Sequence, residues 1–298
     1  MLETKPTRPP PELIYPEPNG HSDSTTKWQV RVVPNRFPAV QPEVPCPKTG
    51  EISKDLKSLH ARICGFGFHE VIIESPNHAI SFTDLSEPQA RFTMMAYRDR
   101  MAKMRDDKRV RHVQVFKNVG SASGASIEHT HSQLVALPIV PEDIVIGLAM
   151  AREWSEKNAQ GCLYCHLVDE EMEAKSRIVQ ETDQFVAFCP FASRFPYETW
   201  ILPRQHASHY EFSNDLLLTE LAPFMKDVVR RIERVTGRSD YNFLLQSAPL
   251  DTKDLPHYHW HFEVFPRITI AAGFEWGTGI FINPVPPEEA AAKLRDAV

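Results

Sequence analysis

Two clusters of histidines have a spacing that places several imidazoles on one side of an extended strand. The first is His129-Thr130-His131-Ser132-Gln133, and the second is His257-Tyr258-His259-Trp260-His261. Alternate residues of a strand share a face, so His129, His131 and Gln133 project together, as do the three histidines of the second cluster. Burying such groups requires a ligand, a metal or complete hydrogen bonding. Two aligned clusters therefore favour catalysis or metal binding over a solvated strand face.

A loop of small residues precedes the first cluster and has the composition of a phosphate-binding segment. Residues 118–126 read Asn-Val-Gly-Ser-Ala-Ser-Gly-Ala-Ser and follow an expected strand directly. Glycines let backbone amides approach an anion, and serine hydroxyls donate to phosphate oxygens. The segment before the second cluster, 246–255, contains a proline and no glycine. We therefore expect the first cluster to be the catalytic one.

The clusters belong to an internal repeat that organises the chain. Three pairs of blocks match in the same order and without internal gaps: 36–38 with 194–196, 69–78 with 197–206, and 129–133 with 257–261. Three matches in register indicate two copies of one unit.

The elements that must position the clusters follow from hydrophobic periodicity and capping signals. Strands are predicted at 110–117, 132–137, 241–245 and 262–265, and helices at 87–105 and 213–235, the second capped at 213–215. Each copy thus has strands, a helix and a final pair of strands, which predicts an α+β fold of two tandem units, each an antiparallel sheet with helices packed on it. The predicted boundaries are a proline-rich extended arm (1–27), the first unit (28–142), a helical link (143–160) and the second unit (161–298).

A Cys-x-x-Cys motif predicts a metal site in the second unit. Cys162 and Cys165 offer two thiolates from one turn, which is the spacing of tetrahedral zinc sites. By the repeat, His206 and His257 stand where they would complete a Cys2His2 set, and four protein ligands indicate a structural zinc. A thioredoxin-like redox pair is the alternative, but the surrounding pattern does not fit it.

The histidine half of an equivalent site exists in the first unit. His78 and His129 occupy these positions, but the matching cysteine pair would have to precede Trp28, where the sequence has no cysteine. We therefore expect no well-formed zinc site there. The remaining histidines of the second cluster, His259 and His261, are interpreted as a degenerate copy.

At this point the sequence resembles a known family. The string Gly124-x-Ser126-x-x-His129-x-His131-x-Gln133 is similar to the signature of galactose-1-phosphate uridylyltransferases, the two-copy branch of the histidine-triad superfamily. Segments 31–38 and 75–78 also resemble family segments, and the likeness extends from residue 28 onward. The resemblance implies that His131 attacks the α-phosphorus of a nucleotide-sugar and that a sugar-1-phosphate or phosphate captures the nucleotidyl-histidine.

The same resemblance assigns further residues and a partner. It implies that Gln133 holds the phosphoryl oxygens, and that the chain is a homodimer. The other implied contacts are Asn118, Gly124 and Ser126 to the phosphates, Asn35 and Val71 beside the nucleoside, and Glu275 to the sugar hydroxyls.

Several functions within and beyond this chemistry stay open. Uridylyl transfer between UDP-glucose and a hexose-1-phosphate is the default prediction. An ADP-sugar phosphorylase or adenylyltransferase is the close alternative, because Asn35 and Val71 do not indicate which nucleotide base is bound. A plain histidine-triad hydrolase is disfavoured by Gln133, since a histidine at that position normally assists attack by water. A zinc-stabilised nucleotide-binding protein with an inactive first site is the alternative from another class.

Composition excludes several broad classes of protein. The 298 residues are 42% hydrophobic and 24% charged, which is typical of a globular protein. A net charge of -6 gives no reason to expect a nucleic-acid partner. No apolar run approaches a membrane span, and the first twenty residues lack an apolar signal core. We therefore expect a cytoplasmic protein that binds neither nucleic acid nor membrane.

Overall fold

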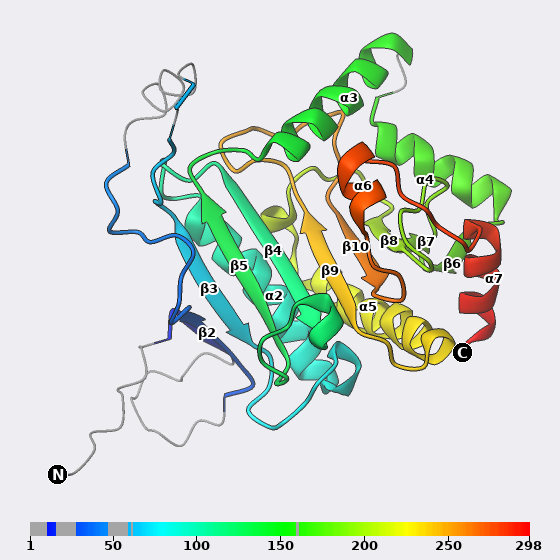
Figure 1. Cartoon of the computed structure of the whole chain (residues 1–298), viewed down its shortest axis with the longest axis horizontal. Helices are drawn as coiled ribbons and strands as arrows, with labels where there is room; N and C mark the ends of the chain where they lie inside the picture. Colours follow the sequence, from blue (N-terminus) through cyan, green and yellow to red (C-terminus); the bar gives the residue numbers. More distant parts are fainter. Residues whose placement is uncertain (1–10, 16–27, 47–58, 61, 159–160) are drawn as a thin grey trace.

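One antiparallel sheet contains every strand of the described residues (Figure 1). The computed structural model describes residues 11–15, 28–46, 59–60, 62–158 and 161–298. The strand order is β1-β2-β3-β5-β4-β9-β10-β8-β7-β6. The strands are β1 (Leu13–Tyr15), β2 (Val30–Pro34), β3 (Phe68–Ile73), β4 (His112–Val119), β5 (His131–Leu137), β6 (Ile178–Glu181), β7 (Phe185–Phe188), β8 (Thr199–Pro203), β9 (Tyr241–Gln246) and β10 (His261–Pro266).

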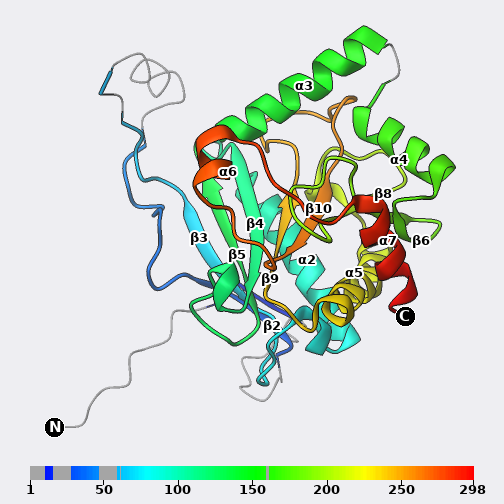
Figure 2. The ribbon, with the colours of Figure 1, turned by 45° about the vertical axis from the view of Figure 1, so that its right-hand side comes forward.

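Two long helices cover one face of this sheet and pack against each other. They are α2 (Glu87–Met104) and α5 (Asp215–Thr236), which confirms the two predicted helices. A capping box of Ser86 and Gln89 begins α2, and the Asn214 side chain accepts the backbone N–H of Leu217 to begin α5. In Figures 1 and 2 both helices lie behind the sheet, whereas α6 (Gly273–Thr278) lies in front of it. The described residues also form the α-helices α3 (Glu142–Asn158), α4 (Leu163–Ala174) and α7 (Pro287–Asp296).

The α+β fold of two tandem units is confirmed, and the sheets of the two units are joined edge to edge. β1 to β5 come from the first unit and β6 to β10 from the second, and β4 pairs with β9 in the middle. The segment expected to be an arm contributes β1, which pairs with β2. Residues 1–10 and 16–27 of that segment, and residues 159–160 at the end of the predicted link, lie outside the described residues. Within the described residues, no helix combines the length and apolar character that a membrane crossing requires.

Side chains of β5 alternate between the two faces of the sheet. Ser132 points toward the helices, where its hydroxyl meets Tyr97 of α2. His131 and Gln133 therefore point to the opposite face, which α2 and α5 leave uncovered. The fold thus separates a helix-covered core face from a functional face.

The predicted alignment of the two histidine clusters is wrong by two residues. The backbone N–H of Thr130 donates to Ala79, and that of Trp260 donates to Ala207 in the same way. The imidazole Nδ1 of His131 lies 2.8 Å from the carbonyl of His129, and that of His261 lies 3.0 Å from the carbonyl of His259. His131 therefore corresponds to His261, not His259. Because the second cluster has three histidines at alternate positions, the His129-x-His131 pair can be aligned with it in two registers. Only the backbone contacts distinguish these two registers.

Candidate functional site

His131 opens β5 with its imidazole held in one orientation. Its Nδ1 lies 2.8 Å from the carbonyl oxygen of His129, and because a carbonyl only accepts, Nδ1 carries the proton. The lone pair of Nε2 is thereby left available. Burial lowers the pKa of His131 below its usual 6.5, so the ring is neutral near neutral pH. The geometry and the protonation state are both those of a nucleophilic imidazole.

Gln133 lies on the same face, two residues along β5, and is held by a histidine of the neighbouring strand. His69 accepts the backbone N–H of Ala39 at Nδ1, so its Nε2 carries the proton and lies 2.8 Å from the Gln133 side-chain oxygen. The Asn35 side-chain amide is 3.0 Å from the same His69 nitrogen. Val71 stands opposite Gln133 in the β3–β5 register. The structure thus brings Asn35, Val71 and Gln133 together.

Sequence reasoning missed His69, although a signal for it was present. His69 lies two residues before Val71 on β3, so the two side chains share a face of the sheet. The alternation rule that grouped His131 with Gln133 would have placed His69 on the face of Val71, and the β3–β5 pairing brings that face to Gln133. Its role here is to orient the Gln133 amide.

The small-residue loop after β4 is anchored by the second unit. Asn242 of β9 stands opposite Asn118 of β4, and its side-chain NH2 donates to the Asn118 side chain at 2.7 Å and to the carbonyl of Ser123 at 3.0 Å. Asp240 accepts the backbone N–H of Ala122 at 2.6 Å. Neither Asp240 nor Asn242 was predicted, because only the β4–β9 pairing brings them to the loop.

Two glycines allow this loop to turn tightly. Gly120 has φ +80°, and a Cβ there would lie 1.9 Å from a carboxylate oxygen of Asp240. Gly124 has φ +87°, a backbone conformation that residues with a side chain rarely adopt. The next predicted contact residue, Ser126, is exposed. The loop therefore presents small residues and backbone groups beside the start of β5, as a phosphate cradle requires.

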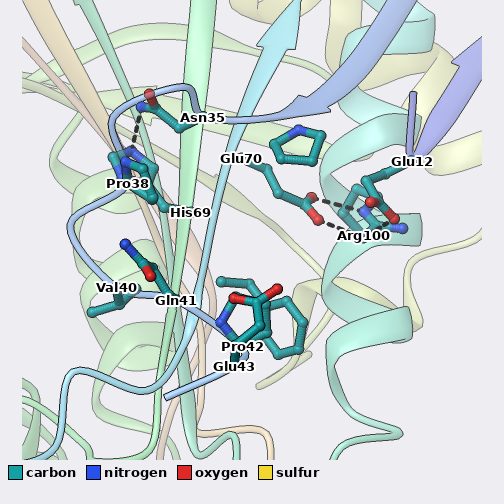
Figure 3. Close-up of a pocket in the computed structure, with 12 residues that line it drawn as sticks. Glu12, Asn35, Pro38, Val40, Gln41, Pro42, Glu43, His69, Glu70 and Arg100 are labelled. Carbon is teal, nitrogen blue, oxygen red and sulfur yellow. Dashed lines mark hydrogen bonds and ion pairs between the residues drawn. The ribbon is translucent and has the colours of Figure 1, made fainter. Parts of the chain in front are cut away.

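A pocket of about 330 Å³ adjoins the site at the edge of the sheet (Figure 3). Asn35 and His69 line one side, and the ion pair between Glu70 and Arg100 lines the other. Asn35 and His69, which line the pocket, also belong to the hydrogen-bonded group around Gln133. Space for part of a ligand thus exists next to the His131 face.

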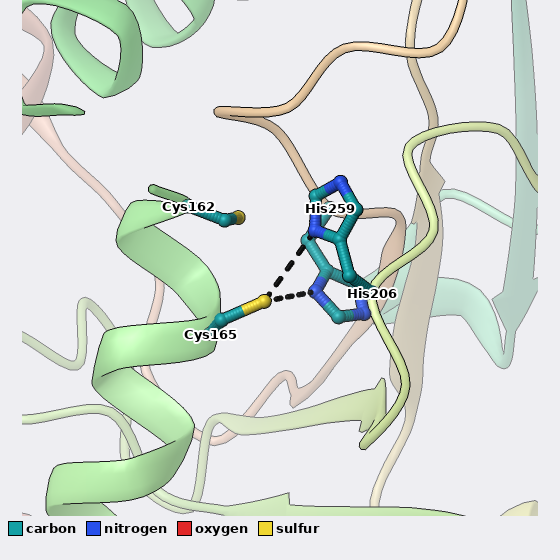
Figure 4. Close-up of side chains that lie close together, drawn as sticks. All are labelled: Cys162, Cys165, His206 and His259. Carbon is teal, nitrogen blue, oxygen red and sulfur yellow. Dashed lines mark hydrogen bonds between the residues drawn. The ribbon is translucent and has the colours of Figure 1, made fainter. Parts of the chain in front are cut away.

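The structure assembles a Cys2His2 cluster, but with a different second histidine from the one predicted. Cys162, Cys165, His206 and His259 offer ligand atoms that all lie within 4.8 Å of one another (Figure 4). The Cys165 sulfur is 3.4 Å from Nδ1 of His206 and 3.5 Å from Nδ1 of His259. The prediction of His257 as a ligand is therefore corrected to His259. The reason is the two-residue shift in the repeat, since His259 corresponds to His129.

The donor set fits a soft, tetrahedral metal. A hydrogen bond with Cys165 lowers the pKa of the Cys162 thiol to about 4, which favours a thiolate at neutral pH. Burial lowers the pKa of His259, so its imidazole is neutral and can bind a metal. Nε2 of His259 is buried without a hydrogen-bond partner in the described part of the chain. Two thiol sulfurs and two imidazoles are the ligand set of structural zinc sites.

The corresponding pair in the first unit has different surroundings. The rings of His78 and His129 are 6.0 Å apart, and Nε2 of His129 lies 2.9 Å from the carbonyl of Ser75. Among the described residues, no third cysteine, histidine or acidic side chain joins them in a metal-binding group.

The second-unit counterpart of His131 is closed off. His261 is 2% exposed and packs against the rings of Tyr164 and Trp200, each with its centroid 5.0 Å away. Glu263 takes the place of Gln133 and pairs with Arg194. Among the described residues, aromatic rings and an ion pair therefore surround the second-unit histidine.

Glu275 belongs to α6, which lies on the side of the sheet opposite α2 and α5. Its carboxylate accepts the backbone N–H of Ala272 at 2.8 Å and so caps α6. Within the described residues, no hydrogen bond joins it to the His131 cluster.

Known proteins are similar in sequence to nearly the whole chain. ADP-glucose phosphorylase of Arabidopsis thaliana is 33% identical over 276 residues, which cover 92% of this chain and 76% of that protein. Galactose-1-phosphate uridylyltransferase of Thermotoga maritima is 31% identical over 271 residues, which cover 88% of this chain and 82% of that protein. The chain belongs to the galactose-1-phosphate uridylyltransferase family.

Structural comparison agrees with membership of the galactose-1-phosphate uridylyltransferase family. The crystal structure of the Arabidopsis ADP-glucose phosphorylase with bound ADP-glucose has a TM-score of 0.83 at 31% identity, covering 97% of this chain and 87% of that chain. A family model described as a domain of unknown function, DUF4921, matches residues 67–298. That range contains both His131 and the Cys2His2 cluster.

Proposed function

We propose that the chain is a nucleotidyltransferase that carries a nucleoside monophosphate on His131, with an ADP-sugar as donor. The observation that carries the proposal is the neutral imidazole of His131, whose Nδ1 is occupied by the His129 carbonyl and whose Nε2 has no hydrogen-bond partner among the described residues. The adenylyl donor is supported by the similarity to ADP-glucose phosphorylase and to its ADP-glucose complex. The default prediction of uridylyl transfer therefore becomes the second candidate, supported by the Thermotoga relative.

The reaction proceeds in two displacements at one phosphorus. Nε2 of His131 attacks the α-phosphorus, a P–N bond forms, and the P–O bond to the β-phosphate breaks, so the sugar-1-phosphate leaves with the electron pair. An oxygen of phosphate or of a sugar-1-phosphate then attacks the same phosphorus, and the P–N bond breaks to restore the neutral imidazole. Each step requires donors that face the phosphoryl oxygens.

The residues around His131 supply these donors. The Gln133 side-chain oxygen is engaged by His69, so its NH2 group is left to donate to a phosphoryl oxygen. The loop with Gly124 and Ser126 offers backbone amides and a hydroxyl, and Asn118 borders it. Asn35 and Val71 flank the nucleoside, and Glu275 contacts the sugar.

Zinc occupies the Cys162, Cys165, His206 and His259 cluster in this proposal. With four protein ligands the metal has no position for substrate, so its contribution is structural. It joins the start of α4 to the turn after β8 and to the start of β10. None of the phosphoryl transfer passes through it.

A homodimer is also proposed, because α6 and its flanks expose many apolar side chains. Six side chains between residues 268 and 282 are 46% to 77% exposed: Ile268, Ile270, Phe274, Trp276, Ile280 and Ile282. Contiguous exposed apolar surface marks interaction sites. Sedimentation velocity should show a dimer that Trp276→Glu converts to monomer, and a wild-type monomer at micromolar concentration would contradict the proposal.

Intact-protein mass spectrometry tests the central proposal. The protein is incubated briefly with ADP-glucose or UDP-glucose, beside His131→Ala and the matched variant His261→Gln. We expect a mass gain of one AMP in the wild type and in His261→Gln, and none in His131→Ala. A UMP adduct alone would select the second candidate. No adduct with either donor, in folded and metal-loaded protein, would contradict the proposal and favour a nucleotide-binding protein with an inactive site.

The acceptor is identified by chasing the isolated adduct. Phosphate should release ADP, whereas glucose-1-phosphate or galactose-1-phosphate should release the corresponding ADP-sugar. Loss of the nucleotide to water alone would indicate a hydrolase.

A further inference from the structure

A charged pair is buried directly beneath the His131 segment, on the helix-covered face of the sheet. The side chains of Lys117 and Glu74 are both fully buried, and Lys117 Nζ lies 2.5 Å from a Glu74 carboxylate oxygen. The same Nζ donates to the Thr130 hydroxyl at 2.8 Å and to the backbone carbonyl of His131 at 3.1 Å. One ammonium group therefore holds both the carbonyl of the nucleophile and the side chain before it.

The remaining polar atoms of this pair are also satisfied. The Thr130 hydroxyl donates to the Glu74 oxygen that Lys117 contacts, at 2.5 Å. Ser132 donates to the other Glu74 oxygen, and the Tyr97 hydroxyl lies 2.5 Å from Ser132. A buried ion pair is costly unless its geometry and hydrogen bonds are complete, and it is not needed for stability where apolar residues fit. Stability alone therefore does not explain why a buried ion pair occupies this position.

The second unit fills the same positions with apolar side chains. With Thr130 corresponding to Trp260, the strand registers match Lys117 with Leu245, Glu74 with Pro203 and Ser132 with Phe262. That unit instead has the Cys2His2 cluster at His259, the counterpart of His129. The charged network thus accompanies the unit with the proposed nucleophile, His131, and the apolar packing accompanies the unit whose histidine packs against Tyr164 and Trp200.

We propose that Lys117, Glu74 and Thr130 are positioning residues for His131. The inference rests on the proposed nucleotidyl transfer. The network holds the backbone of residues 130 and 131 from the face opposite the imidazole. The His129 carbonyl therefore stays in position to orient the His131 ring, and Nε2 stays directed at the α-phosphorus. Small misplacements of a reacting atom cost large factors in rate, because the attack geometry must be set before the reaction.

Thr130 gives the sharpest test, because valine has nearly its shape and lacks only the hydroxyl. The rate of AMP transfer to His131 is measured at several ADP-glucose concentrations. We expect Thr130→Val to lower the rate at saturation by about tenfold or more. The half-saturating concentration should change by less than about twofold, because no substrate contact is removed. Thr130→Ser keeps the hydroxyl and should retain the wild-type rate within about twofold.

The matched control is Thr199→Val. Thr199 is a fully buried threonine of β8 whose hydroxyl donates to the Tyr197 carbonyl at 3.1 Å. This control carries the same chemical change in the other half of the sheet, and we expect the wild-type rate. If Thr130→Val matches Thr199→Val in rate, or raises only the half-saturating concentration, the positioning role is wrong.

A second readout does not depend on catalysis. The imidazole nitrogen resonances of His131 should report a single Nδ1-protonated tautomer in the wild type and in Thr130→Ser, and a mixture of tautomers in Thr130→Val. If the wild type forms no adduct, the proposed function fails, but these spectra still test the network. Identical spectra in all variants would overturn the inference.

Discussion

At the scale of single residues, the chemistry of the site depends on the charge state of His131. A protonated imidazole has no lone pair with which to attack phosphorus. Burial disfavours the charged form, and the His129 carbonyl places the single proton on Nδ1. The nucleophile is therefore ready at neutral pH without a separate base.

This gives a prediction for the pH dependence of labelling. Because the folded pKa of His131 lies below 6.5, the neutral ring persists as the pH falls from 8 to 6.5. The rate of AMP transfer should therefore decline with a midpoint below pH 6.5, and by about tenfold per pH unit once the ring is mostly protonated. Single-turnover mass spectrometry across pH measures it. A midpoint at or above 6.5 would contradict the assigned burial effect.

At the scale of elements, the cradle loop depends on a strand from the other unit. Asn242 holds both Asn118 and the carbonyl of Ser123, so β9 sets the position of a loop that belongs to β4. The loop has few other side-chain anchors apart from Asp240. Its order is thus a property of the β4–β9 pairing.

Asn242→Ala should therefore slow AMP transfer without removing a group from substrate. We expect a loss of about tenfold, because misaligned donors stabilise the developing charge poorly. Metal content should be unchanged, since the Cys2His2 cluster lies elsewhere. Asn283→Ala is the control, because its side chain donates only to carbonyls of the second unit. Equal rates in the two variants would show that the loop needs no anchor.

The metal cluster offers a direct test of the corrected ligand set. His259→Ala should reduce bound zinc from about one per chain to near zero, since only three ligands remain, whereas His257→Ala should leave it unchanged. Elemental analysis after dialysis measures both. Loss of zinc in His257→Ala but not in His259→Ala would instead support the ligand set predicted from the sequence. Removal of zinc by a chelator should also lower the thermal midpoint, because metal binding stabilises the folded state.

At the scale of the whole molecule, the two units share one sheet and one core. Phe243 of β9 is fully buried and meets Phe82 and Tyr97 of the first unit, with ring centroids 6.0 and 6.5 Å apart. It also packs against Phe262 of its own unit. Contacts of this kind couple the stability of the two halves.

Phe243→Ala should therefore destabilise both units together. Removing a buried phenylalanine costs about 3–5 kcal/mol. We expect one urea transition, shifted to lower concentration, with far-UV circular dichroism and tryptophan fluorescence coinciding. Phe191→Ala, at a side chain 76% exposed, should change little. Two separate transitions in the wild type would contradict a shared core.

The sequence by itself determined the family and the duplicated α+β fold, and it predicted most of the candidate site. These features depend on local patterns: alternation along β5, the small-residue loop, the Cys-x-x-Cys pair and the caps of α2 and α5. Such signals are carried by neighbouring residues, so they can be read without knowing where distant segments lie. The same rule places His69 on the face of Val71, although its contact with Gln133 depends on the pairing of β3 with β5.

Only the tertiary structure decided the register of the second cluster and the residues that support the first. The choice between His257 and His259 depends on a backbone bond from Trp260 to Ala207, some fifty residues away. The anchors Asp240 and Asn242 reach the loop through the pairing of β4 with β9. Lys117 of β4 meets Glu74, which follows β3, because β3, β5 and β4 are consecutive strands of the sheet. These contacts depend on which strands become neighbours, and that is settled by the packing of the whole sheet, not by any local pattern.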